Sequence, residues 1–170
     1  MILTPHAVVG AAIANMFPDN PALGFTLAFV SHYALDILPH TDYSINNFLH
    51  KESKTVKSIF QDAGASLHFL FIVFDFIFAV IFCILFFVRN EKSAIITLLG
   101  LLGGILPDFF QFLYYKYKNQ PWIFFQMLHD KIHHTKIEGS RERILGILFQ
   151  IFIPICFLVV YYLVKNKIPF

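Results

Sequence analysis

The stretch Leu67–Val88 reads LHFLFIVFDFIFAVIFCILFFV and decides the fold class of this chain. A helix needs about 20 predominantly apolar residues to cross the hydrocarbon core of a bilayer. The stretch meets that length, and only His68 and Asp75 interrupt it with polar side chains. Phe, Ile and Val also favour strands, but strands run for only about 4–8 residues, so the length favours a helix. The stretch therefore predicts a membrane-spanning helix.

Two other segments, Ala94–Tyr115 and Ile144–Val164, are also long and apolar enough to span. Ala22–Leu38 is marginal in length, and Ala7–Phe17 is too short, which indicates a re-entrant, interfacial or core helix. We therefore predict an all-α integral membrane bundle of about five to six helices, three or four of them spanning. A single domain would cover residues 1–170. A very apolar soluble helical protein is the alternative, and the length of Leu67–Val88 argues against it.

The composition also indicates a membrane protein. Of the 170 residues, 57% are hydrophobic and 14% are charged, whereas about a quarter of the residues in soluble domains are charged. The net charge of +2 and the absence of a basic stripe with interleaved aromatic residues indicate no nucleic-acid partner. Membrane lipid is the expected partner, and the sequence leaves the oligomeric state open.

Histidine and aspartate recur where an apolar helix should tolerate neither, most clearly in SHYALDILPH, residues 31–40. His32 and Asp36 are spaced i,i+4, as are Asp36 and His40. On a helix such pairs stand on one face, about 6 Å apart at Cβ, which suits two ligands of one metal ion. Burying these groups without partners costs several kcal/mol each. The alternative is that His32 and Asp36 pair with each other and with the backbone.

A second His-rich stretch, HDKIHH, spans residues 129–134. His129 and His133 are spaced i,i+4, and Leu128 and Ile132 beside them indicate a partly buried face. We predict that this pair binds metal, while His134 supports it from outside the ligand set. The alternative is an exposed helix end, where cationic histidine is favourable.

Isolated polar residues complete the pattern. Thr4 and Pro5 indicate a helix start, with Thr4 as N-cap, and His6 follows them. Asp108 follows Pro107 at the end of a Gly-rich apolar helix, where a buried acid needs a partner. We interpret Asp75 as a hydrogen-bonding residue that orients helices, paired with His68 or a tyrosine.

The predicted site therefore has nitrogen and oxygen ligands and no thiolate, which favours zinc, and also suits iron or manganese, as one or two ions. Asp36 or Asp108 would act as a catalytic base. The predicted metal ligands are His6, His32, Asp36, Asp108, His129 and His133. The predicted supporting residues, which would orient those ligands, are His40, His68 and His134.

These motifs resemble those of the membrane-bound metal-dependent hydrolase family, through Thr4-Pro5-His6, the His32-x3-Asp36 helix, Pro107-Asp108 and the late His-rich patch. The stretch from His32 to His40 is also similar to a metal-binding helix of the zinc-dependent phospholipase C and nuclease fold. The resemblance implies an all-helical protein of a prokaryotic inner membrane, with His32 and Asp36 as metal ligands.

The predicted function is metal-dependent hydrolysis of a phosphoester or lipid-type substrate at a membrane face. A non-catalytic metal- or haem-binding protein, or a purely structural membrane protein, is the alternative. The positive-inside rule places the loops richer in Lys and Arg in the cytoplasm. Those loops are 39–66 and 116–143, and they lie on the side of His40, His129 and His133.

Overall fold

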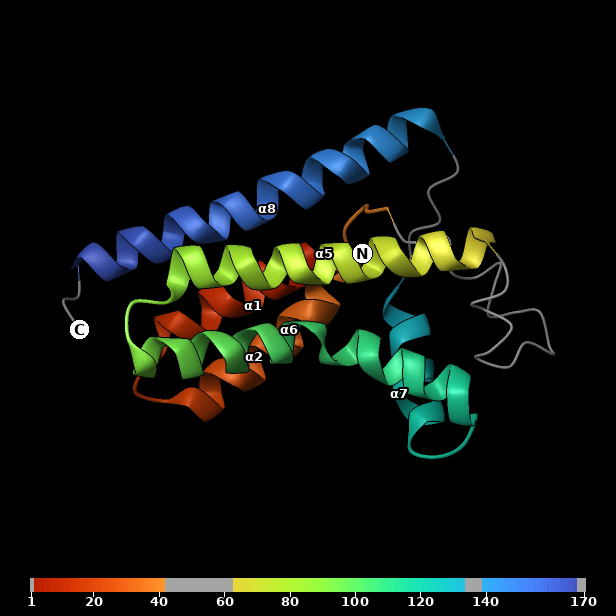
Figure 1. The fold of residues 1–170 in the computed structure, drawn as a ribbon, viewed down its shortest axis with the longest axis horizontal. Coiled ribbons are helices and arrows are strands. Elements are labelled where there is room, and N and C mark those ends of the chain that lie inside the picture. Colours follow the sequence, from red (N-terminus) through yellow and green to blue (C-terminus); the bar gives the residue numbers. More distant parts are fainter. Residues whose placement is uncertain (1, 42–62, 134–138, 168–170) are drawn as a thin grey trace.

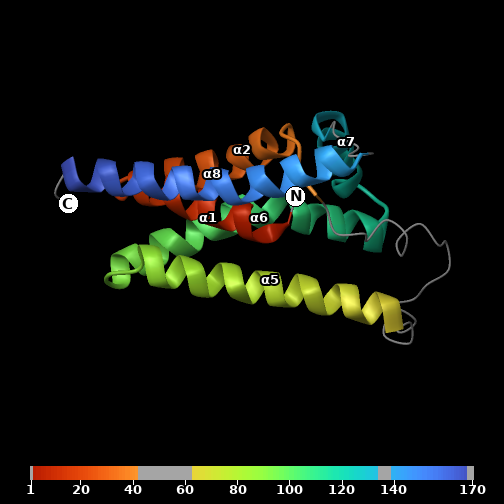
Figure 2. The same ribbon diagram turned by 90° about the horizontal axis from the view of Figure 1, so that it is seen from above.

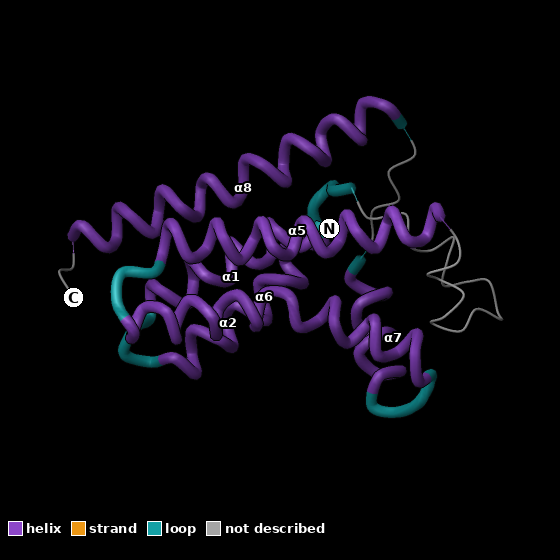
Figure 3. Tube along the Cα trace, in the orientation of Figure 1, coloured by secondary structure: helices purple, strands orange, loops and turns teal. Residues whose placement is uncertain are grey.

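The computed structural model describes residues 2–41, 63–133 and 139–167. Within these ranges every regular element is an α-helix, as Figure 3 shows. This confirms the all-α bundle predicted from the sequence. The helices are α1 (Leu3–Met16), α2 (Pro21–Asp36), α5 (Ala63–Phe87), α6 (Glu91–Tyr117), α7 (Trp122–Ile132) and α8 (Ser140–Lys167).

Three of these helices, α5, α6 and α8, are long and apolar enough to cross a membrane. The candidate spans are Phe69–Phe87, Glu91–Tyr117 and Ser140–Asn166. Large apolar side chains stand exposed along them, such as Phe74 and Leu85 of α5. Such a surface is expected where helices face lipid rather than water.

Helix α1 is short and lies at the centre of the bundle, in contact with α2, α5, α6 and α8. Figure 2 shows it between the two long helices α5 and α8. Its small residues allow a close approach to α6. A Cβ atom at Gly10 would collide with the carbonyl oxygen of Gly100, and one at Gly104 would collide with that of His6. This small-residue packing brings His6 close to α6.

The N-terminus of α1 is capped from another helix, which corrects the sequence-based prediction. The N-cap residue is Ile2, not Thr4, and it provides no side-chain hydrogen bond. Instead the Asp75 carboxylate of α5 accepts hydrogen bonds from the Thr4 backbone N–H, at 3.1 Å, and from the Thr4 hydroxyl. The first N–H groups of a helix have no partner within the helix, and a negative charge there is favourable. Asp75 thus orients helices, as expected, but through Thr4.

Helix α6 contains a proline directly before Asp108. Asn90 and Ser93 start the helix with a reciprocal capping box. Pro107 lies inside α6, and its ring nitrogen cannot donate to the preceding turn. Beyond Pro107, α6 continues towards α7, as Figure 1 shows, and Phe110 packs against Phe125 of α7 with ring centroids 4.5 Å apart.

Candidate metal centre

Side chains from four helices, and from His40 just after α2, form one buried cluster where α1 begins, α2 ends, α6 passes Pro107 and α7 ends. Each contributing position follows from a local signal in the sequence. The α1 ligand lies in its first turn, the α2 ligands lie one turn apart, and the α7 ligands lie at its last turn and C-cap. The members are His6, His32, Asp36, His40, Asp108, His129 and His133.

Asp36 lies at the centre of this cluster and is 1% exposed. Its Oδ1 atom is 3.2 Å from Nε2 of His6 and 3.9 Å from Nε2 of His40. Its Oδ2 atom is 3.0 Å from Nε2 of His32 and 3.3 Å from Nε2 of His129. Both carboxylate oxygens therefore face imidazole nitrogens from different helices.

Asp108 and His133 extend the cluster in two directions. Oδ1 of Asp108 lies 3.6 Å from Nε2 of His32 and 4.0 Å from Nε2 of His129. The Asp108 side chain is 21% exposed, so it is the more accessible of the two carboxylates. On the other side, Nε2 of His133 lies 2.9 Å from Nε2 of His40.

These distances define three overlapping ligand groups, each with one ligand atom per residue and all such atoms within 4.8 Å of one another. His32 and Asp36 each belong to two of the groups, so the groups share ligands rather than standing apart. Such overlap suits one ion, or two neighbouring ions that share a carboxylate. The groups are His6–His32–Asp36, His32–Asp108–His129 and Asp36–His40–His133.

Backbone carbonyls orient two of the imidazoles. Nδ1 of His32 lies 2.7 Å from the carbonyl oxygen of Gly104, and Nδ1 of His40 lies 2.7 Å from that of Leu38. A carbonyl oxygen only accepts, so each Nδ1 must carry the proton and donate it. In the neutral ring, Nε2 then presents its lone pair to the cluster. This arrangement is typical of metal-binding histidines.

The electrostatics of the empty cluster differ from one residue to the next. Burial, and after it the charge of His32, lower the pKa of His6 to about 4 although Asp36 opposes them, so His6 is neutral at pH 7. Burial opposes charge on His32 too, but Asp108 and Asp36 outweigh it and raise the pKa of His32. Burial also opposes charge on Asp36, yet His129, His32 and His6 around it lower its pKa.

Several atoms of the cluster lack hydrogen-bond partners among the described residues. Nδ1 of His6 and Oδ2 of Asp108 form no hydrogen bond there, although both atoms are buried, and Nε2 of His6 and of His32 have a carboxylate oxygen of Asp36 as neighbour, at 3.2 and 3.0 Å. An unsatisfied buried polar atom costs about 1–3 kcal/mol. A divalent cation would accept the lone pairs of the imidazoles and of the carboxylates together. The cluster can therefore hold a metal ion.

The structure brings all six predicted ligands together. Metal binding by these residues stays a prediction. His40, predicted as a supporting residue although its spacing to Asp36 also suits a ligand, lies within ligand distance itself. Two predicted supporting residues fall outside the description: His134 lies outside the described residues, and the side chain of His68, within α5, is not described. Asp130, the neighbour of His129, is exposed and accepts a hydrogen bond from Gln126 at 2.7 Å.

Sequence reasoning missed three contributors to this cluster. The carbonyl of Gly104 orients His32, and no residue type marks a backbone acceptor. The amide of Gln111, three residues after Asp108 on α6, reaches Nδ1 of His129 at 3.5 Å. The i,i+3 spacing to Asp108 was the available signal for Gln111. Tyr33 lies beside His32, with ring centroids 5.5 Å apart.

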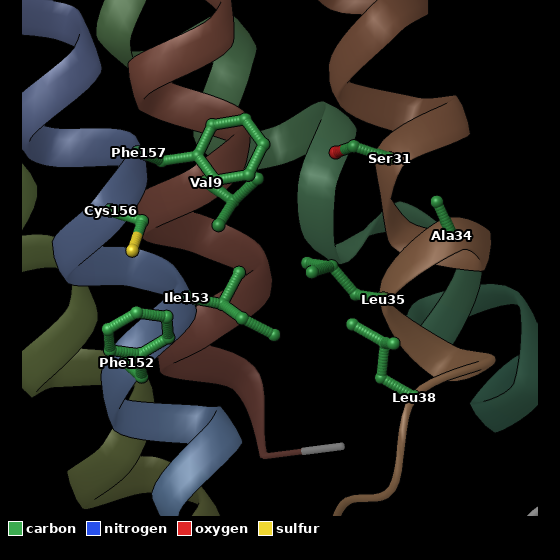
Figure 4. Close-up of a pocket in the computed structure, with 9 residues that line it drawn as sticks. All are labelled: Val9, Ser31, Ala34, Leu35, Leu38, Phe152, Ile153, Cys156 and Phe157. Carbon is green, nitrogen blue, oxygen red and sulfur yellow. The ribbon is translucent and has the colours of Figure 1, made fainter.

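An apolar groove lies between α8, α2 and α1, as Figure 4 shows. Its volume is about 360 Å³. Its lining includes Leu35 of α2 and Leu38 just after α2, and none of the seven cluster residues. The groove is therefore separate from the ligand cluster. It is lined by Val9, Ser31, Ala34, Leu35, Leu38, Phe152, Ile153, Cys156 and Phe157.

Comparison of the chain with protein-family models, curated proteins and solved structures found no match.

Proposed function

We propose that this protein is a metal-dependent hydrolase that acts on a phosphoester or lipid-type substrate at a membrane face. The observation that carries the proposal is the meeting of five histidines and two aspartates from four helices in a buried cluster. The motifs of the cluster also support membership of the membrane-bound metal-dependent hydrolase family. Candidate membrane spans in three of the helices support a substrate that is presented by the lipid phase.

Zinc is the ion that this ligand set suits best. Imidazole nitrogens and carboxylate oxygens are its usual ligands besides thiolate. Cys83 lies in α5, where its thiol meets the carbonyl oxygen of Ala7 at 3.7 Å rather than the cluster. The overlapping groups provide ligands for one or two ions. Bound zinc would acidify a water molecule and polarise the ester to be cleaved.

The two carboxylates suit different roles. Asp36 is enclosed by four imidazoles and buried, which suits a ligand held in place. Asp108 is partly exposed, and its Oδ2 atom has no hydrogen-bond partner among the described residues. A general base must reach both the cluster and the incoming water. We therefore assign Asp108 as the base and Asp36 as a ligand.

Removal of two ligands tests the metal site. His32→Ala combined with Asp36→Asn should lower the metal content of purified protein from at least one ion per chain to below about 0.2, with helicity retained. The matched control is Asp19→Asn, because Asp19 is 79% exposed and pairs only at the surface with Lys92. Elemental analysis measures the metal content, and circular dichroism measures the helicity.

The outcomes of this experiment separate the alternatives. Full metal content in the double variant would refute the site. A wild-type protein without metal, unaffected by chelators, would favour the structural alternative. A Soret band in the optical spectrum would favour haem. If the metal-loaded protein cleaves neither a chromogenic phosphoester nor a phospholipid, the proposed hydrolase activity is refuted. The protein would then bind metal without catalysis.

We also propose that the cluster lies on the cytoplasmic side of a prokaryotic inner membrane. The distribution of Lys and Arg supports this side. In a protein without Cys83 and Cys156, a cysteine at Lys92 should react with a membrane-impermeant maleimide in intact cells. A cysteine at Lys131 should react only after permeabilisation, and the reverse pattern would overturn the assignment.

A further inference from the structure

The hydroxyl of Tyr33 is buried, yet it has no hydrogen-bond partner among the described residues. Tyr33 lies three residues before Asp36 within α2, a spacing that places the two residues on one side of the helix. The hydroxyl therefore belongs to the helix side that carries the ligand cluster. Unlike the other unsatisfied atoms of that side, it is not a usual ligand for zinc.

The surroundings of Tyr33 combine aromatic rings and negative charge. Its ring packs edge-on against His32, with centroids 5.5 Å apart, and against Phe29, at 5.6 Å. Burial raises the pKa of Tyr33, and the charges of Asp36 and Asp108 raise it further. The negative charges of both carboxylates therefore act on the Tyr33 hydroxyl.

Buried hydroxyl groups normally have a partner, because leaving one unsatisfied costs free energy. Asp36 is enclosed by imidazoles, and His32 directs its Nδ1 proton to a backbone carbonyl. The cluster therefore consists of metal-ligand atoms and hydrogen-bond acceptors, whereas the Tyr33 hydroxyl beside it is a hydrogen-bond donor. An oxyanion bound at the cluster would have oxygens that do not contact metal and need such a donor.

We propose that the Tyr33 hydroxyl donates a hydrogen bond to a phosphoryl oxygen of a phosphate or phosphoester bound at the His/Asp cluster. This inference rests on the proposed function and names the chemistry of its ligand. Tyr33 would be a substrate-binding residue rather than a metal ligand. The phosphoryl group can belong to a lipid headgroup or to a soluble phosphate, and both present the same acceptor.

The variant Tyr33→Phe removes only the hydroxyl. With zinc-loaded protein in detergent, it should bind inorganic phosphate about tenfold more weakly than the wild type by isothermal titration calorimetry, the loss of roughly one hydrogen bond. Its zinc content should be unchanged. Its thermal unfolding temperature without phosphate should be equal or higher, because no hydrogen bond of the folded protein is lost. Phosphatidic acid in lipid nanodiscs provides the second arm, and a similar loss is expected there.

The matched control is Tyr162→Phe in α8. The hydroxyl of Tyr162 donates to the carbonyl oxygen of Phe86 at 2.8 Å and accepts from Arg89 at 3.0 Å. This variant should unfold at a lower temperature and bind phosphate like the wild type, which is the opposite pattern to that of Tyr33→Phe.

The results that overturn the inference differ from those that overturn the proposed function. Unchanged phosphate affinity in Tyr33→Phe, or a lowered unfolding temperature like that of Tyr162→Phe, would overturn the role of Tyr33 alone. A wild-type protein that binds no zinc would overturn the proposed function, and the Tyr33 role with it. Tighter wild-type binding of phosphatidic acid than of phosphate would support the role and identify a lipid source.

Discussion

At the scale of single residues, the site depends on a carboxylate that is almost completely removed from solvent. Asp36 is 1% exposed, and a buried charge is tolerated only with partners close by. Nε2 atoms of His6, His32 and His129 provide them at 3.0–3.3 Å. Removing one member of such a buried set typically costs about 3–5 kcal/mol, because the others lose their partner.

The protonation states of two histidines predict how metal binding depends on pH. A histidine binds metal through a neutral ring, so a protonated ring must first lose its proton. At about pH 7 His6 is already neutral, since its pKa lies at about 4, whereas the raised pKa of His32 keeps more of it protonated. Metal binding should therefore release protons from His32, and metal affinity should rise with pH up to the pKa of His32 and then level off.

Calorimetric titration of the metal in two buffers with different ionisation enthalpies measures this release. The observed heat should differ between the buffers in proportion to the protons released. Identical heats at about pH 7, together with an affinity that does not change with pH, would contradict the predicted protonation state of His32.

At the scale of elements, the short helix α1 determines where His6 lies. Two features hold it: the close packing of Gly10 and Gly104 at the interface with α6, and the cap that Asp75 provides from α5. The cap acts on Thr4, only two residues before His6. A shift of the first turn of α1 would therefore move His6 away from Asp36.

Thr4→Val tests this cap, because it removes the hydroxyl that Asp75 accepts from while keeping the shape of the side chain. We expect the free energy of unfolding to fall by about 1–2 kcal/mol and metal affinity to weaken as His6 loses its position. Unfolding by SDS titration and calorimetric titration of zinc are the two measurements.

Thr26→Val provides the control within the same chain. Thr26 is exposed on α2, and its hydroxyl donates to the carbonyl oxygen of Ala22 at 2.8 Å. Its replacement should change the free energy of unfolding by no more than about 0.5 kcal/mol and leave zinc binding unchanged. Equal effects of the two variants would show that the contact between α1 and α5 does not position His6.

At the scale of the whole molecule, the cluster joins helices that the chain separates widely. Its ligands come from α1, α2, α6 and α7, whereas among the described residues α5 and α8 contribute none. Figure 1 shows α5 and α8 as long helices beside the others. The described ligands thus lie on short helices, on residues that directly follow α2 and α7, and on α6 past its proline, while α5 and α8 provide much of the apolar exterior.

A metal that joins four helices should stabilise the folded state. Because the ligand set exists only in the folded protein, binding adds about 2.7 kcal/mol at a free metal concentration 100 times the Kd. Removal of metal by a chelator should therefore lower the thermal unfolding temperature, and added zinc should restore it. Asp36→Asn should unfold at a temperature that neither treatment changes. A chelator-insensitive wild-type protein would show that no structural metal is present.

The sequence by itself determined the helical membrane class and the residue types of the site. Length and composition of Leu67–Val88 are local properties, as is the i,i+4 spacing of His32 and Asp36, and local properties can be read without a structure. The same holds for the proline that precedes Asp108. Together with the His129/His133 spacing and the helix start before His6, these signals identified six of the seven residues of the cluster as candidate ligands.

Only the tertiary structure decided which side chains meet and how they are oriented. It placed His40 among the ligand atoms, directed Nδ1 of His32 to the Gly104 carbonyl, and gave Asp75 a partner in Thr4. These contacts depend on the relative positions of helices packed through glycine, which spacing along the chain does not specify. Periodicity reports the face of a helix on which a residue lies, whereas the neighbour of that face is set by packing over the whole bundle.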